Sequence, residues 1–458
     1  MRRTVLLSSA LAFFLALAWL HPRGLSWDEL AFLMGAEART IDLGHALYLP
    51  ALRGTARLCS PSLSPEQAAR LFSAAGAALA FVLLARRAER AGASSGCALL
   101  VAALFSTGTL FWRESGSVEP TSWTIAGLLL AAELAEAYSR DRSAQLGALF
   151  GLGFGLSLGF HLVSLCALPW LLALALGARG RPPLAHLLLL CGVALCVLLL
   201  GAVLGDLPAA WRYWSGFVPT YDAGLASELG RHTRRAVPLL CEGAPVLVVL
   251  GLVCALALAR RRPRAVATAG ALAAPYALAF LVLGKPLVGL LLPVLLACAL
   301  LVGEAAGAAR VQVRLGTALL ALALAVQLAL SLPEALEWRR APDRDRERAA
   351  LLVRHLPEDA VLFAGRLANH VRYFHPGAPL VSLPELWHEA FARDRAADPI
   401  DVVQRAVAGA GRRCLLSLDG VAFLQSIPAD PLRLGIEEGA ALLVPGDPLP
   451  LLFPLDRE

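Results

Sequence analysis

The stretch "RTVLLSSALAFFLALAWLHPRGLSWDE", Arg3–Glu29, joins an apolar run to an acidic pair. The apolar part, residues 4–20, approaches the length of about 20 residues with which a helix crosses the hydrocarbon core of a bilayer. No A-x-A-like cleavage site follows it, so we expect a retained membrane anchor and not a cleaved signal peptide. The acidic residues Asp28 and Glu29 would then lie close to the membrane surface.

The composition extends this expectation to most of the chain. Of the 458 residues, 58% are hydrophobic and only 17% are charged, whereas a soluble domain usually carries about 25% charged residues. Much of the chain is therefore expected to face lipid. The net charge of +6 does not indicate nucleic-acid binding, because the arginines lie in short clusters between apolar runs, where a topology signal would place them.

Hydropathy predicts about eleven spanning runs. Their extents are 4–20, 67–85, 95–112, 119–137, 144–159, 161–177, 184–204, 237–259, 265–283, 286–303 and 312–332. We divide the segment 144–177 at Gly159–His161, because one long run there would break the alternation of basic loops. The predicted fold class is an α-helical polytopic membrane protein, with residues 1–332 forming the membrane domain.

Arginine in every second loop sets the expected orientation, because basic residues favour the cytoplasmic side. The basic loops carry Arg2 and Arg3, then Arg86, Arg87 and Arg90, Arg140 and Arg142, Arg179 and Arg181, residues 260–264, and Arg310 with Arg314. The loops expected outside are 21–66, 113–118, the turn near His161, 205–236, Gly284–Lys285 and everything after 333. We expect an integral protein of a bacterial inner or plasma membrane, with a cytoplasmic N-terminus.

The character of the chain changes from about Pro333. A charged helix-like segment is followed by short apolar strands, "AVLFAG", "APLVSL", "CLLSLD" and "AALLVP", that alternate with helical pieces. This alternation predicts a small extracytoplasmic α/β domain over residues 333–458. Most cysteines lie in apolar runs, whereas Cys59 and Cys414 have polar surroundings, and the sequence does not establish whether these two pair.

Asp28 and Glu29 are the first candidate site residues. A carboxylate at the membrane interface can act as a general base towards an acceptor hydroxyl or amide. The alternative is structural, because Ser26 or Asp28 suits the N-cap of a helix. The two roles are compatible, since the apolar spacing that follows predicts a helix lying in the interface plane, which would hold a carboxylate rigidly.

Other polar residues are expected on the same outer side. His45 and Tyr48 lie in the first outer loop, and Glu119 marks the start of a span. His161 and Lys285, which is the only lysine, interrupt apolar sequence. Each has a simpler interpretation: a solvated loop histidine, a carboxylate favoured by the helix dipole, or a lysine that snorkels to lipid headgroups.

This pattern resembles the GT-C superfamily of integral membrane glycosyltransferases, whose first outer loop carries an acidic motif just past the first span. Here "SWDE" occupies that place. The stretch "LGHALYLPAL" is similar to the "HPPGYP" region of the DUF2723 family, related to protein O-mannosyltransferases, although it lacks the prolines. "VEPTSW" stands where that family has "EVY", and "GLSLGFHLVSLCALP" is similar to its histidine-containing stretch.

The resemblance implies transfer of a hexosyl or pentosyl group, with inversion, from a polyprenyl-phosphate-linked donor to a protein, lipid or glycan acceptor. Asp28 would be the general base, with Glu29 beside it in the catalytic motif. The substrate-binding residues would be His45, Tyr48, Glu119, His161 and Lys285, with Lys285 and an arginine of the 205–236 loop meeting the phosphate. No cofactor is firmly predicted, and dependence on a divalent metal is left open.

Two other classes of protein compete with the enzyme. A transporter or flippase of a lipid-linked saccharide needs ionisable residues at mid-membrane depth, often on broken helices in repeated halves. A non-catalytic assembly protein needs no convergence of polar residues. The predicted spans are nearly free of charge at their centres and the candidates share one side, which favours a one-sided active site.

Overall fold

The computed structural model describes residues 3–21, 24–37, 45–177, 184–203, 225–282, 288–308, 313–394, 397–427, 434, 442–443 and 451–455. These residues divide into two compact units. A helical unit holds the described residues up to 21 and from 45 to 340. An α/β unit holds residues 24–37 together with the described residues from 341 onward.

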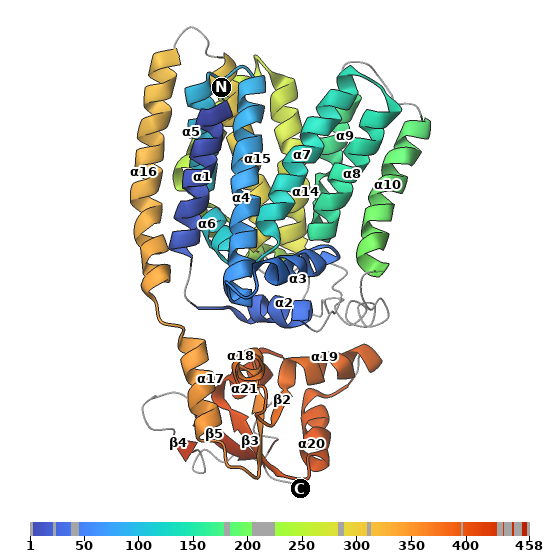
Figure 1. The fold of residues 1–458 in the computed structure, drawn as a ribbon, viewed down its shortest axis with the longest axis vertical. Coiled ribbons are helices and arrows are strands. Elements are labelled where there is room, and N and C mark those ends of the chain that lie inside the picture. The colour runs from blue at the N-terminus through green and yellow to red at the C-terminus, as the bar shows by residue number, and fades with distance from the viewer. Residues whose placement is uncertain are drawn as a thin grey trace. The chain divides into compact units, whose positions relative to one another are not determined.

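The helical unit is built almost entirely from apolar helices (Figure 1). In chain order they are α1 (Arg3–Leu20), α3 (Tyr48–Cys59), α4 (Pro65–Arg90), α5 (Ser95–Ser106), α6 (Thr109–Gly116), α7 (Thr121–Arg140), α8 (Ala144–Phe160), the 3-10 helix η2 (Leu162–Ala167), α9 (Leu168–Leu176), α10 (Leu184–Val203), α12 (Leu225–Gly243), α13 (Pro245–Ala259), α14 (Pro263–Val282), the 3-10 helix η3 (Val288–Leu291), α15 (Leu292–Ala308) and α16 (Val313–Arg340).

Every predicted apolar run falls on one or two of these helices, and the division at His161 is confirmed by the end of α8 at Phe160. Four helices of the described chain are long and apolar enough to cross a membrane, and six if each of two bent pairs is one span. Three shorter apolar helices, including α1 and α8, accompany them. The protein is thus mostly helical with several apolar helices, and the count of about eleven spans stays a prediction.

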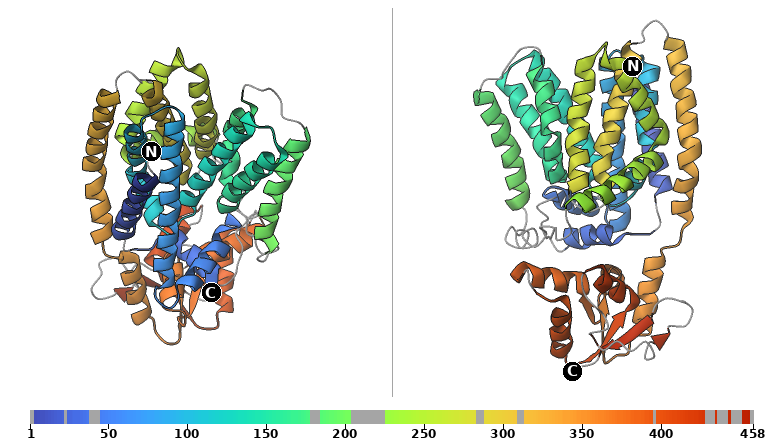
Figure 2. Two further views of the ribbon diagram at one scale, coloured as in Figure 1. Left: turned by 45° about the horizontal axis from the view of Figure 1, so that its top comes forward. Right: turned by 180° about the vertical axis from the view of Figure 1, so that it is seen from behind.

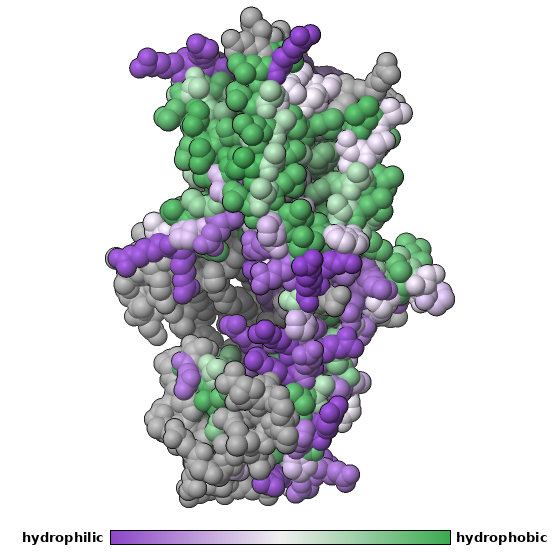
Figure 3. Space-filling view, turned by 90° about the vertical axis from the view of Figure 1, so that its left-hand side faces the viewer, coloured by the Kyte–Doolittle hydropathy of each residue, from purple (hydrophilic) through white to green (hydrophobic). Residues whose placement is uncertain are grey.

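The exterior of the helical unit is apolar. Figure 3 shows the side that carries α16, where hydrophobic residues cover most of the unit and hydrophilic residues gather at its upper end. Large apolar side chains are exposed on α1, α13 and α16: Leu7, Leu11, Leu15, Leu252, Leu256, Leu319 and Leu322. Exposed surface of this kind is stable against lipid and not against water, so the helical unit is a membrane domain.

Ion pairs gather at the end of the helical unit that the arginine pattern assigns to the cytoplasm. Arg87 Nη2 lies 2.7 Å from Glu136 Oε1, and Arg90 Nη1 lies 3.4 Å from Glu133 Oε1, both between α4 and α7. Arg262 Nη1 lies 2.7 Å from Glu304 Oε2. The basic clusters therefore also hold neighbouring helices together.

The two bent helix pairs meet at their breaks. The axis turns by 71° between α5 and α6, and by 103° between the end of α12 and α13. A Cβ on Gly108, in the first break, would lie 2.8 Å from the carbonyl oxygen of Gly243, next to the second. Thr109 Oγ1 donates to the carbonyl oxygen of Glu242 at 3.0 Å, which supplies a partner for backbone left open at the bend. The right-hand view of Figure 2 shows α12 running obliquely across the lower end of the helices.

Glycines at four-residue spacing let α8 approach its neighbours closely. A Cβ on Gly151 would lie 2.6 Å from the carbonyl oxygen of Leu190, and one on Gly155 would lie 2.9 Å from Cα of Ala194. Both contacts join α8 to α10. Small residues are the common means of helix packing in membranes, where lipid removes the hydrophobic drive between helices.

The α/β unit has a five-stranded sheet in the order β2-β1-β3-β5-β4. Its elements are α2 (Trp27–Glu37), α17 (Arg344–Arg354), β1 (Ala360–Ala364), α18 (Ala368–Phe374), β2 (Leu380–Ser382), α19 (Leu383–Arg393), α20 (Pro399–Gly409), β3 (Arg413–Ser417), α21 (Leu418–Ser426), β4 (Leu442–Leu443) and β5 (Leu451–Leu455). Strands β2, β1 and β3 are parallel, and β5 is antiparallel to both β3 and β4. Alternate residues of the strands build two cores, with Leu362 and Leu415 in one and Phe363 and Leu416 in the other.

The division into units differs from the boundary expected at residue 333. Helix α16 continues through Pro333 to Arg340, so the second unit begins later in the chain. The first outer loop is also divided, because α2 packs against α18 and groups with the α/β unit. Cys59 is partly buried, and Cys414 is buried in an apolar core although the residues directly before it in the sequence are polar. The two cysteines form no disulfide with each other.

Because α8 and α10 approach closely, we expect two glycine substitutions to differ in their effect on stability. Gly155→Val should lower the melting temperature of the detergent-solubilised protein, because overpacking costs about 1–3 kcal/mol. Gly192→Val on α10 is the matched control, because a Cβ there meets nothing within 4 Å. A Gly155→Val variant as stable as Gly192→Val would contradict this packing.

Candidate active site

The acidic motif begins helix α2 with reciprocal hydrogen bonds. The Ser26 backbone N–H donates to Glu29 Oε2 at 2.6 Å, and the Glu29 backbone N–H donates to Ser26 Oγ at 3.2 Å. This is a capping box, with Ser26 as the N-cap residue. Glu29 is only 5% exposed, whereas Asp28 is exposed. The structural role therefore falls to Ser26 and Glu29, and Asp28 keeps a carboxylate on the surface.

The opposite side of α2 is fixed by apolar contacts. Leu30 and Leu33 are buried, one turn apart in the helix, and Leu25 is buried just before the cap. The spacing puts these leucines on one face, so Asp28 points away from the packed side. The cap and the buried leucines fix the backbone that carries Asp28, and a general base needs such a defined position.

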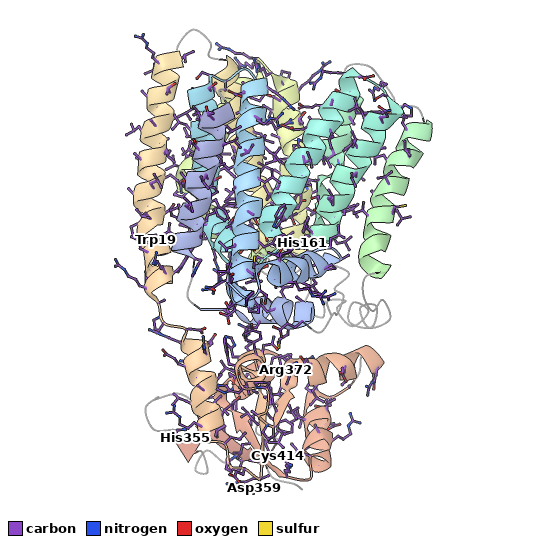
Figure 4. The ribbon with its side chains drawn as sticks, viewed as in Figure 1. Trp19, His161, His355, Asp359, Arg372 and Cys414 are labelled. Carbon is purple, nitrogen blue, oxygen red and sulfur yellow. The ribbon has the colours of Figure 1, made fainter. Side chains whose placement is uncertain are left out.

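His45 and His161 come together in the helical unit, from segments far apart in the chain. Their ring centroids are 4.6 Å apart, with an angle of 67° between the rings. The Leu47 N–H donates to the carbonyl oxygen of Gly159 at 2.7 Å, and a Cβ on Gly159 would collide with the Leu47 side chain. Figure 4 shows His161 at the lower end of the helical unit.

The orientation of His161 follows from the break between α8 and η2. Its Nδ1 accepts the N–H of Val163 at 3.3 Å, so His161 caps η2. A ring nitrogen that accepts in this way carries no proton, so Nε2 carries the N–H in the neutral ring. His161 can therefore donate one hydrogen bond through Nε2.

An aromatic cluster includes Phe160, which directly precedes His161 in the chain. Phe72 stacks on Trp123 with centroids 4.8 Å apart, and Trp123 stacks on Phe160 at 5.5 Å. Tyr48 lies 6.1 Å from Phe72 and is completely buried, so its ring supports this cluster from inside. The cluster joins α3, α4, α7 and α8 at the lower end of the helical unit.

Glu119 lies beside the same cluster, at the start of α7. Ser73 Oγ donates to its carbonyl oxygen at 3.2 Å, and Ser122 Oγ donates to the carbonyl oxygen of Ser73 at 2.7 Å. Trp123 Nε1 donates to the carbonyl oxygen of Phe72 at 2.8 Å. The structure thus brings His45, Tyr48, Glu119 and His161 to one region of the helical unit. Asp28 and Glu29 belong to the α/β unit, and Lys285 lies outside the described residues.

A buried arginine near the start of α4 escaped the sequence analysis. Arg70 is 7% exposed, and its Nη1 donates to His21 Nδ1 at 3.1 Å. Both line a cavity of about 180 Å³ with Leu17, Ala18, Leu63, Gln67, Leu71 and Gly116. Arg70 lies inside the apolar run 67–85, and an ionisable residue within a span is a functional candidate by default, so that signal was present.

The described residues contain no group of three or more His, Cys, Asp or Glu that could hold a metal ion. The other expected phosphate partners were the arginines of the 205–236 loop. Arg234 and Arg235 lie on α12 and are exposed, in contrast to the buried Arg70. Arg70 is therefore a buried cation that lines a cavity, where it could meet a phosphate.

Comparison with solved structures identifies a class of membrane enzyme with the same fold. The chain is similar over its whole length to the GT-C glycosyltransferase ArnT from Cupriavidus metallidurans. In the apo state of ArnT the TM-score is 0.65 at 14% identity, with 100% of this chain and 99% of that chain covered. In the complex with undecaprenyl phosphate the TM-score is 0.62 at 13% identity, with 98% and 97% covered. The chain therefore has the fold of ArnT, in keeping with the fold that the sequence resemblance implied.

The chain is also similar in part to the Saccharomyces cerevisiae protein O-mannosyltransferase Pmt1-Pmt2 complex bound to the sugar donor. This similarity covers 44% of this chain and 34% of that chain, with a TM-score of 0.37 and 19% identity. No family model matches the chain, and no curated protein does. The expected branch of the superfamily therefore stays a prediction.

The capping box predicts that two substitutions of Glu29 differ in their effect on the stability of the first turn of α2. Glu29→Gln keeps an acceptor for the Ser26 N–H and should preserve the folded start of α2. Glu29→Ala removes it and should destabilise that turn by about 0.5–2 kcal/mol. Amide exchange at residues 26–30 measures the difference, and equal exchange in the two variants would contradict the assignment of Glu29 as the capping partner.

Proposed function

We propose that the protein is a glycosyltransferase that moves a sugar from a polyprenyl-phosphate-linked donor to an acceptor on the non-cytoplasmic face of the membrane. The observation that carries the proposal is the division of roles in α2, where Glu29 completes the cap and Asp28 is exposed. The fold shared with ArnT, one structure of which is bound to undecaprenyl phosphate, supports a lipid-linked donor.

The reaction needs one proton acceptor and one cation. An oxygen of the acceptor attacks the anomeric carbon, and the bond from this carbon to the phosphate oxygen breaks. The polyprenyl phosphate leaves with the electron pair, and Asp28 takes the acceptor's proton. The displacement inverts the anomeric carbon. A phosphate is already a good leaving group, so a strong general acid is not required.

Arg70 and Lys285 are the proposed phosphate partners. The guanidinium of Arg70 presents several N–H donors and stays charged, which suits a phosphate. The apolar members of its cavity, Leu17, Leu63 and Leu71, suit the first carbons of a lipid chain. Lys285 would act as a second point charge. Each cation would stabilise the charge that develops on the departing phosphate.

His161, His45 and Glu119 are proposed to orient the sugar or the acceptor. The Nδ1 hydrogen bond to the Val163 N–H fixes the ring of His161, and His45 packs against that ring. Tyr48 contributes from within the aromatic cluster. The proposed acceptor is a protein, lipid or glycan that carries a nucleophilic oxygen or amide.

The central test of this function uses membranes and a panel of polyprenyl-phosphate sugars. Wild-type membranes should release polyprenyl phosphate from at least one of these donors. Asp28→Asn should lower this rate by at least about 100-fold, in keeping with the contribution of a general base. Glu29→Gln, which keeps the cap, is the matched control and should retain activity. Normal transfer by Asp28→Asn would refute the role of Asp28.

A second prediction concerns the phosphate. Arg70→Gln should raise KM for the donor by about tenfold or more, because hydrogen bonds to charged groups contribute about 1.5–3 kcal/mol. Arg264→Gln is the control, since Arg264 is exposed in the first turn of α14, in the segment expected in the cytoplasm. A KM for the donor that is the same in both variants would remove Arg70 from the donor site.

A further inference from the structure

Helix α2 is part of the α/β unit, although hundreds of residues separate it in the chain from the rest of that unit. Residues 24–37 cluster with the C-terminal residues, and α2 packs against α18. Gly24 lies against Asp343, with a Cβ on the glycine 3.6 Å from Asp343 Cγ. The C-terminal region therefore has a direct structural relation to the acidic motif.

Helix α18 is held at its first turn by the partly buried carboxylate of Asp419. Asp419 Oδ2 accepts the Leu367 N–H at 2.9 Å, and Asp419 Oδ1 accepts the Ser417 hydroxyl at 2.5 Å. A Cβ on Gly365 would collide with the Asp419 backbone, so the loop after β1 lies directly on the loop after β3. Burial raises the pKa of Asp419, and the hydrogen bonds from Ser417, Leu367 and Gly365 oppose that rise.

The last turn of α18 is held by a two-fold ion pair with α19. Arg372 Nη1 lies 2.5 Å from Glu385 Oε1, and Arg372 Nη2 lies 2.7 Å from Glu385 Oε2. The hydrogen bonds to Glu385 raise the pKa of Arg372. Fork-to-fork pairs of this kind fix direction as well as distance. With both ends fixed, α18 is a rigid support for whatever packs on it.

His370 is the residue of α18 that reaches the acidic motif. Its ring is 1% exposed, and its Nε2 donates to the carbonyl oxygen of Leu25 at 2.9 Å. A carbonyl only accepts, so the proton resides on Nε2. Among the described residues, Nδ1 of His370 has no hydrogen-bond partner. Leu25 directly precedes Ser26, so this bond fixes the backbone where it enters the capping box.

We propose that His370 is a positioning residue, which fixes the start of α2 and thereby the direction of Asp28. The proposal rests on the proposed function, because it assigns the α/β unit a part in presenting the general base. The Leu25 carbonyl oxygen lies before α2 and, among the described residues, accepts no hydrogen bond within that helix, and His370 supplies a buried N–H donor for it. Loss of that donor leaves the carbonyl buried and unsatisfied, which favours a shifted first turn.

The first test measures the position of α2 without using activity. Hydrogen–deuterium exchange of the full-length protein in detergent should be at least about tenfold faster over residues 26–33 in His370→Leu than in the wild type. His370→Gln offers an amide N–H in a similar place and should restore protection. His355→Leu is the matched control, because His355 is an exposed histidine of the same unit.

Exchange in β1 and β3 serves as an internal check that the α/β unit remains folded. Unchanged protection of residues 26–33 in His370→Leu, with both strands protected, would overturn the proposal. If β1 and β3 also lose protection in His370→Leu, the comparison is made between His370→Gln and the wild type. Exchange over residues 26–33 that is at least about tenfold faster in His370→Gln than in the wild type, with both strands protected, would then overturn the proposal.

The second test measures catalysis. His370→Leu should lower kcat by up to about 100-fold, because a small displacement of a catalytic group has an effect of this size. The KM for the donor should change little. In an Asp28→Glu background the carboxylate is already displaced, so His370→Leu should cost a smaller factor. An equal factor in both backgrounds would show that His370 does not act through Asp28.

The outcomes separate this inference from the proposed function. If Asp28→Asn keeps full activity, the proposed function fails, whatever α2 does in the exchange experiment. If Asp28→Asn is inactive while His370→Leu keeps the wild-type kcat, the function stands and the positioning role of His370 fails.

Discussion

Reciprocal hydrogen bonds between Ser26 and Glu29 fix the first turn of α2, and the account of the site depends on them. They satisfy two backbone N–H groups that a helix start leaves open, and they occupy one of two adjacent carboxylates. The other, Asp28, then stands exposed on a helix whose opposite face is packed by Leu30 and Leu33. The structural role thus falls to Ser26 and Glu29, and the chemical role of the neighbouring Asp28 is our proposal.

Most of the helical architecture could be predicted from the sequence, because lipid forces each span to be apolar along its whole length. The break at His161 was also visible, since the charge pattern required it. The bends near Gly108 and Ala244 could not be predicted, because each depends on packing against the other break, which is distant in the chain. In the α/β unit, "AVLFAG", "APLVSL" and "AALLVP" contain β1, β2 and β4, and "CLLSLD" contains all of β3 except its first residue, Arg413. Strand β5 was missed because Pro454 is atypical of an inner strand.

The candidate site was predictable in its residue types and less so in its partners. Hydropathy and the arginine pattern favoured one side for His45, Glu119 and His161, and the structure brings them to one aromatic cluster. The grouping of α2 with the α/β unit could not be foreseen, because it rests on contacts with α18 that involve residues more than three hundred positions away, such as the Leu25–His370 hydrogen bond. Arg70 was overlooked because a single arginine does not interrupt an apolar run.

The chemistry of the donor distinguishes a transferase from a carrier of intact lipid-linked sugar. The most direct measurement follows a donor labelled separately in its sugar and in its phosphate, in proteoliposomes that contain the full-length protein and candidate acceptors. The account predicts that the sugar label leaves the lipid while the phosphate label stays on it, and that Asp28→Asn stops this separation. Both labels remaining together on a lipid that crosses between leaflets would contradict the account.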